Sequence, residues 1–373
     1  MKISKKRALG ALFIFSITLS YAAQYTVSKD PNRVAQYTDL QLAIDDAANG
    51  DTILVYGATT AYGSINVYKP LVLIGEGYNP NNGLVTTIST LTLSRFNSTL
   101  SASGSTILGL NINTLNLTTT YSGSTTAEQL LENITILRCN INSSMTLGQP
   151  SQSETYTNMN FINNIFNGVI YLEYSTTIED IEDFTFSNCI FKSAYFYGGL
   201  TRTSGVLTDF SDLSNVKVYN SLFLADEGGL LQTTVGMVFE DNIFFGFELY
   251  RGDYAQITWN NNLFYLVDQT VDLLTNDNVG SGNLVDINPL FTTYPATPIA
   301  FSYDHDYTLQ AGSPALTASL SGGEIGIYGG AYPFVVGANP PVPKITEVTI
   351  QDGTSSVPVG GTINFNFKAE SGN

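Results

Sequence analysis

Three acidic residues occupy equivalent positions after successive copies of a short sequence repeat. They are the strongest candidates for chemistry in this sequence. Glu227, Glu248 and Asp268 each stand six residues after the same point in three successive copies of the repeat. If the copies stack as strands about 4.8 Å apart, neighbouring carboxylates lie about 5 Å from each other. Such carboxylates can carry out glycoside hydrolysis or bind Ca²⁺ through their oxygens. A solvated row of acids is the third interpretation, and all three stay open.

Four tyrosines are candidates for a surface that stacks on sugar rings: Tyr195, Tyr197, Tyr250 and Tyr265. A tyrosine joins an apolar ring to a polar tip, so it suits a half-exposed place beside a polar ligand. Trp259 fits an interior better, because the other copies of the repeat have apolar residues at its position. Carbohydrate binding through the tyrosines is therefore the second chemistry that the residues suggest.

Other kinds of active site lack their residues. The chain has one histidine, His305, and two separated cysteines, which excludes a zinc site made of Cys and His. Acids outnumber bases by 32 to 15, so the net charge is −17. Nucleic acid is excluded as a partner, because phosphate binding needs clustered Lys and Arg.

The short repeat that precedes the acids and tyrosines alternates apolar and polar residues before a turn. One copy is 239–244, FEDNIF. At steps of 25, 25, 32, 21 and 20 residues, the turn position is held by Cys139, Asn164, Cys189, Ser221, Asn242 and Asn262. Alternation is typical of strands, and a period in this range indicates stacked units that share a core. The repeat therefore predicts an all-β fold, a parallel β-helix, with Phe186, Phe239 and Trp259 in one buried column.

The same stacking predicts two unbonded cysteines. Cys139 and Cys189 share a column but are separated by the coil of Asn164. Their Cα atoms should then lie about 9.6 Å apart. A disulfide needs less than about 7 Å.

The first 22 residues have the layout of a secretory signal peptide. Four basic residues lie in the first seven positions, an apolar run covers 8–19, and Ser20-Tyr21-Ala22 forms a small-x-small cleavage site. The apolar run is too short to span a membrane. We expect a secreted or cell-surface protein that is cleaved near Ala22, with no membrane span in the mature chain. Cleavage would take the net charge from −17 to −21.

A short amphipathic helix is expected after the signal peptide. Thr38 and Gln41 form a capping box with Thr38 as N-cap, and Asn49-Gly50 ends the helix. The first coil of a solenoid exposes its core, so the helix should act as an N-terminal cap.

Segments at both ends resemble the pectin-lyase-like group of secreted right-handed parallel β-helix proteins. The opening segments are 37–44 (YTDLQLAI), 49–55 (NGDTILV) and 69–77 (KPLVLIGEG), and the closing segments are 288–291 (NPLF), 307–315 (YTLQAGSPA) and 325–330 (IGIYGG). The resemblance covers roughly residues 25–335 and implies a right-handed parallel β-helix. It leaves activity open, because the group contains lyases, hydrolases, epimerases, adhesins and inert shafts. The paired Asp motifs of its galacturonan hydrolases are absent here, as is a Lys/Arg pair of the kind its lyases use.

The expected organisation has four parts: a signal peptide at 1–22, the β-helix at 23–337, a Pro-rich linker at 338–343, and two strands within 344–373. The last part is either the start of an immunoglobulin-like sandwich or an extension that self-associates through residues 344–368.

Three functions remain open at this stage. The first is a non-catalytic β-helix that binds a polysaccharide or cell-surface glycan, or serves as an adhesin-like shaft. The second is a polysaccharide-degrading enzyme, a lyase or glycoside hydrolase. The third is a structural subunit that assembles through its terminal strands. No cofactor is expected except Ca²⁺ at the three acids.

Overall fold

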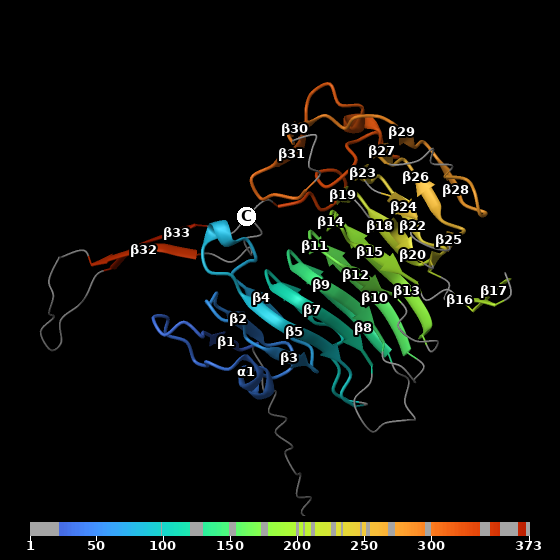
Figure 1. Ribbon diagram of the computed structural model, residues 1–373. Helices are drawn as coiled ribbons and strands as arrows, with labels where there is room; N and C mark the ends of the chain where they lie inside the picture. Colours follow the sequence, from blue (N-terminus) through green and yellow to red (C-terminus); the bar gives the residue numbers. More distant parts are fainter. Residues whose placement is uncertain are drawn as a thin grey trace, which may run out of the picture.

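The computed structural model shows a right-handed parallel β-helix, as the repeat predicts (Figure 1). It describes residues 22–97, 99–119, 130–148, 154–172, 178–198, 201–203, 206–209, 213–224, 229–232, 234–246, 248–250, 254–267, 273–294, 300–335, 344–350 and 365–370.

One long sheet supplies the first strand of each coil. Its described strands lie in the order in which the chain makes them, and neighbours are parallel. They are β1 (Gln24–Val27), β2 (Thr52–Val55), β4 (Val72–Gly75), β6 (Thr106–Leu108), β8 (Leu130–Leu137), β10 (Glu154–Ile162), β13 (Ile178–Ser187), β18 (Val216–Tyr219), β22 (Val238–Glu240), β26 (Thr258–Asn260) and β28 (Val279–Ser281).

The strands that follow the turn form the second long sheet. This sheet bends, so most later coils contribute two short strands to it, one on each side of the bend. The early strands are β3 (Ser64–Val67), β5 (Thr87–Ser94), β7 (Asn111–Thr118) and β9 (Asn140–Leu147). Directly after the turn come β11 (Ile165–Phe166), β14 (Ile190–Lys192), β19 (Leu222–Leu224), β23 (Ile243–Phe245), β27 (Leu263–Tyr265) and β29 (Leu284–Val285). Beyond the bend come β12 (Val169–Tyr171), β15 (Tyr195–Tyr197), β20 (Gly229–Gln232) and β24 (Glu248–Tyr250).

Besides the strands that follow the last coil, four short described strands lie outside the two long sheets. They pair as an antiparallel couple, β16 (Thr201–Thr203) with β17 (Val206–Asp209), and a parallel couple, β21 (Thr234–Val235) with β25 (Tyr254–Ala255).

The core is a set of aromatic columns that run along the solenoid axis. Phe186, Phe239 and Trp259 are fully buried, and the register aligns Phe239 with Trp259. Their rings stack with centroids 4.7 Å apart. A second column after the turn is equally regular, with Phe223 and Phe244 at 4.4 Å. The predicted inward column is therefore confirmed.

The turn between the two sheets depends on two consecutive polar residues. The first adopts a left-handed conformation, with φ of 59° at Asp241 and 54° at Asn261. Asp and Asn tolerate this region better than most residues that carry a side chain. The second is a buried amide: Asn262 Oδ1 accepts from the backbone N–H of Asn242 at 3.0 Å, and Asn262 Nδ2 donates to the carbonyl of Phe239 at 2.9 Å. Repetition of these bonds forms an asparagine ladder that links successive coils.

The two cysteines occupy the ladder position, and both thiols are free and buried, as predicted. Burial raises the pKa of each thiol, Cys139 and Cys189, to about 12. Neither thiol is therefore a nucleophile near neutral pH, because the thiolate is the reactive form.

A helix closes the N-terminal end of the solenoid, at a position one residue later than predicted. Helix α1 (Leu40–Asp46) has Asp39 as its N-cap, where we expected Thr38. The Asp39 carboxylate accepts the backbone N–H groups of Gln41 at 2.8 Å and Leu42 at 3.3 Å. Thr and Asp are both favourable N-cap residues. The path of the chain into the helix therefore decides whether Thr38 or Asp39 takes this position. The first of two described 3₁₀ turns, η1 (Pro80–Asn82), lies between β4 and β5.

The chain after the last coil does not stack as a further coil. Residues 288–294 and 300–335, here called the strap, contain the antiparallel strands β30 (Phe291–Thr293) and β31 (Asp306–Leu309) and the 3₁₀ turn η2 (Pro314–Thr317). The strap covers the outer face of β11, β14, β19, β23 and β27, where its Ile325 and Ile327 belong to the same buried cluster as Ile243. The segments at 288–291, 307–315 and 325–330 that carry the resemblance therefore lie along the side of the solenoid.

Turn residues hold the strap in position. Asn188 Nδ2 donates to the carbonyls of Ile327 at 2.9 Å and Gly329 at 2.8 Å, and Asn163 Nδ2 donates to that of Tyr332 at 2.7 Å. Nearer the last coil, Asn261 Nδ2 donates to the carbonyl of Ala318, and Asp241 accepts from Ser319 and Leu320. The strap therefore runs back along the solenoid towards the N-terminal end.

The terminal strands form an antiparallel hairpin of β32 (Lys344–Ile350) and β33 (Phe365–Glu370). The alternation at 362–367 predicts the second strand, and residues 362–364 lie outside the described residues. Phe365 and Phe367 are 56% and 68% exposed. Self-association through residues 344–368 stays a prediction.

Replacing Phe239 with Ala should lower the free energy of unfolding by about 3–5 kcal/mol, because it empties the middle of the aromatic column. Urea unfolding followed by fluorescence of Trp259 measures this. The control, exposed Phe365→Ala, should change it by less than about 0.5 kcal/mol. Equal effects would contradict the column.

The two thiols should fail to react with an aromatic disulfide reagent at pH 8 in the folded protein, because burial keeps them protonated and covered. Both should react in guanidinium chloride. Prompt reaction of either thiol in the native protein would show that its coil opens readily.

Candidate carbohydrate-binding face

The backbone register beyond the bend does not place Glu248 opposite the position counted for Glu227. Leu222 aligns with Ile243, a step of 21 residues, but beyond the bend Gly229 aligns with Glu248, a step of 19. The earlier coil has two extra residues between its two strands. Glu248 is therefore opposite Gly229, not Glu227, and the count that aligned these two acids was wrong.

Glu227 and Asp268 lie outside the described residues, and for Glu248 the structure describes only the backbone, at the start of β24. Within the described part of the chain, no group of three His, Cys, Asp or Glu side chains is placed to hold a metal ion. Catalysis or Ca²⁺ binding at the acids stays a prediction.

Two of the predicted tyrosines lie on the outer face of the strands beyond the bend. Tyr195 and Tyr197 are half-buried and flank Phe196, which is fully buried in the core. Tyr171 of β12 aligns with Tyr197, and their ring centroids lie 5.5 Å apart at 62°. Val169 aligns with Tyr195. Neighbouring coils therefore bring three tyrosine rings to one place on the outside of the solenoid.

Polar residues continue the rows on which these tyrosines lie. Thr146 aligns with Tyr171 on one side, and Gln232 aligns with Tyr197 on the other. Ser144 precedes Val169 in the row of Tyr195. Rings mixed with hydroxyl and amide groups suit a ligand with apolar faces and many hydroxyl groups. We call this surface, formed by Tyr171, Tyr195, Tyr197, Ser144, Thr146 and Gln232, the tyrosine face.

The other two predicted tyrosines are in different surroundings. Tyr250 aligns with Leu231, which aligns with Phe196, so it continues a core column. Its ring packs on that core and stacks on Tyr254 with centroids 3.6 Å apart. Tyr265 packs against the cluster under the strap, edge-on to Phe245. Both are half-buried, and the two-residue register change and the strap decide their surroundings. A role for them in sugar binding stays a prediction.

Lys192 is a residue that the sequence analysis did not single out. It ends β14, is half-buried, and places Nζ 5.5 Å from the ring centroid of Phe301 in the strap. Burial lowers its pKa from the ordinary value. A lowered pKa helps a lysine to accept protons, but here the cause is the aromatic cover of the strap. The repeat gives no sign of it, because the covering segment is more than 100 residues away in sequence.

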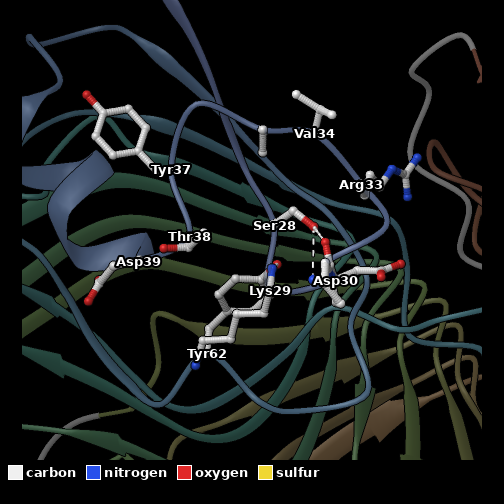
Figure 2. Close-up of a pocket in the computed structure, with 11 residues that line it drawn as sticks. Ser28, Lys29, Asp30, Arg33, Val34, Tyr37, Thr38, Asp39 and Tyr62 are labelled. Atoms are coloured by element: carbon white, nitrogen blue, oxygen red, sulfur yellow. Dashed lines mark hydrogen bonds between the residues drawn. The ribbon is translucent and has the colours of Figure 1, made fainter.

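A hollow of about 580 Å³ lies beside the N-terminal cap, lined by the loop at 28–39 and by Tyr62 (Figure 2). Its two basic residues are engaged in holding the cap. Lys29 Nζ donates to the carbonyl of Ala61 at 2.8 Å and lies over the ring of Tyr62. Arg33 forms an ion pair with Glu76 at 2.7 Å. The hollow is large enough for a small ligand, but its charges already serve the fold.

No family model and no curated protein matches the chain. Among solved structures, a pectin methylesterase from Aspergillus niger is similar, with 14% identity over 82% of this chain and 95% of that chain and a TM-score of 0.33. A pectin methylesterase variant in complex with a hexasaccharide is similar at 10% identity over 70% of this chain and 94% of that chain, with a TM-score of 0.30.

No helix in the described ranges is both long enough and apolar enough to cross a membrane.

A Ca²⁺ site at Glu227, Glu248 and Asp268 predicts that millimolar Ca²⁺ raises the Tm, because an ion that binds only the folded state stabilises it. Thermal unfolding with Ca²⁺ and with EDTA measures the shift. Glu248→Gln should abolish it, whereas the control Asp277→Asn, an exposed acid on the last coil, should retain it. A solvated row of acids predicts no shift in any of these proteins.

Proposed function

We propose that this protein is a secreted or cell-surface β-helix that binds carbohydrate on its tyrosine face without catalysing a reaction. The observation that supports this is the grouping of Tyr171, Tyr195 and Tyr197 on adjacent coils, half-exposed, around the buried Phe196. Strands place these rings more rigidly than loops would, so little entropy is lost when a ligand binds. The signal-peptide pattern at 1–22 supports export.

The shape of the solenoid favours an extended ligand over a compact one. Aligned residues of neighbouring coils repeat about every 4.8 Å along the axis. Thr146, Tyr171, Tyr197 and Gln232 form such a row over four coils. A polysaccharide chain that lies along the axis would meet alternating hydroxyl, ring and amide groups. This is the reason for proposing a glycan chain as the ligand.

Binding to an array of neutral and acidic glycans tests the proposal. Tyr195→Ala and Tyr197→Ala should each weaken the best glycan by about two- to tenfold, because one ring contact is worth about 0.5–1.5 kcal/mol. The double variant should lose more. Tyr332→Ala, which removes a ring that is 53% exposed on the strap, is the matched control and should bind normally.

Two outcomes would overturn the proposal in different ways. If no glycan binds and the variants fold normally, the solenoid is a shaft. If a polysaccharide is cut in a reducing-sugar or unsaturated-product assay, and Glu248→Gln stops the cutting, the protein is a lyase or hydrolase and the acids are its centre.

A further inference from the structure

Asp51 is a buried carboxylate at the N-terminal end of the solenoid, in the turn between α1 and β2. The residue is 3% exposed. Oδ1 accepts from the backbone nitrogen of Ala23 at 2.6 Å, and Oδ2 accepts from that of Ala48 at 2.7 Å. In the part of the chain that the structure describes, no Lys, Arg or His forms an ion pair with it. A buried carboxylate normally has a charged partner or several strong donors.

Ala23 is the residue that directly follows the expected cleavage point. Ser20 and Ala22 are the small residues of the cleavage site, so the cut falls between Ala22 and Ala23. Both alanines are exposed. The backbone beyond it is fixed, because the carbonyl of Ala23 accepts from Thr52 at 2.9 Å and β1 begins at the next residue.

We propose that removal of residues 1–22 creates an ion pair between the new α-ammonium group of Ala23 and the carboxylate of Asp51. This rests on the proposed export of the protein and not on carbohydrate binding. The peptidase hydrolyses the Ala22–Ala23 bond: water supplies the hydroxyl of the new Ala22 carboxyl group and a proton for the departing nitrogen. That nitrogen becomes a primary amine, which binds a further proton below about pH 8.

The nitrogen need not move, because it already lies within hydrogen-bond distance of Asp51. What changes is its charge. A neutral amide donor becomes an ammonium donor, and charge-assisted hydrogen bonds are about twice as strong as neutral ones. The mature protein is therefore more stable to unfolding than the precursor. Cleavage of the signal peptide is the step that stabilises the N-terminal cap.

The pairing also sets a pH dependence. An adjacent carboxylate raises the pKa of the ammonium above its unfolded value of about 7.7–8.0. The added stability is therefore complete below that value and is lost as the pH rises through the raised pKa. Other ionisable groups near this end of the fold are Lys69, whose Nζ donates to the carbonyls of Asp45 and Ala47, and Asp45, Asp46, Tyr25 and Tyr37. They are common to all variants compared below, so their titration cancels.

The test compares the Tm of a chain that begins at Ala23 with that of a chain carrying Gly-Ser before Ala23, both ending at Asn373. At pH 7 the chain that begins at Ala23 should melt about 2–4 °C higher. The difference should vanish near pH 10 and in Asp51→Asn, and it should persist in the matched control Asp277→Asn. If Asp51→Asn fails to fold, acetylation of the Ala23 amine provides the second test, and it should lower the Tm to that of the extended chain.

Equal Tm values for the two unsubstituted chains at pH 7 would overturn the ion pair, as would a difference that survives acetylation. Sequencing the N-terminus of the exported protein tests the cleavage point separately, and a first residue other than Ala23 would also overturn the proposal. Neither measurement depends on a glycan, so failure here is distinct from failure of carbohydrate binding.

Discussion

The tight turn between the two long sheets is the constraint on which the rest of the solenoid depends. Each central coil bends at a residue with φ near +50°. At the bend, backbone N–H and C=O groups lose the hydrogen-bond partners that a neighbouring strand would provide. Asn242 and Asn262 replace the lost partners, because an amide donates and accepts at the same time. This fixes the register of successive coils, and the register brings Phe223 over Phe244 and Phe239 over Trp259. The aromatic core therefore follows from the turn.

The parts of the fold that depend on local patterns could be predicted from sequence. The repeated turn and its flanking alternation predicted the solenoid, the buried column and the free thiols, because each copy reports the same local geometry. The strap could not be predicted this way. Asn163 and Asn188 look like ordinary turn residues, and their bonds to Tyr332 and Ile327 join positions more than 130 residues apart.

In the candidate site, too, the features set by neighbouring residues could be predicted, and those set by distant segments could not. Tyr195 and Tyr197 lie on the outer face because they alternate with Phe196, which is a local property. Counting residues from the turn to Glu227 and Glu248 assumed coils of equal length, and a two-residue difference was enough to misalign them. The packing of Tyr265 beside the strap gives no local signal in the sequence, because the strap is a later part of the chain. Sequence reasoning was reliable within a strand and unreliable across a bend.

The strap changes how the solenoid can come apart. In a simple repeat protein each coil contacts only its neighbours, so unfolding can start at an end and move inward one unit at a time. Here a single segment is bonded to turns that are several coils apart, from Asn261 back to Asn163. The last coil cannot peel away without pulling on a segment that is anchored far behind it. The strap ties distant coils together along the solenoid axis. Because a ribosome makes it after every coil that it covers, the solenoid gains this resistance only after all of those coils have been made.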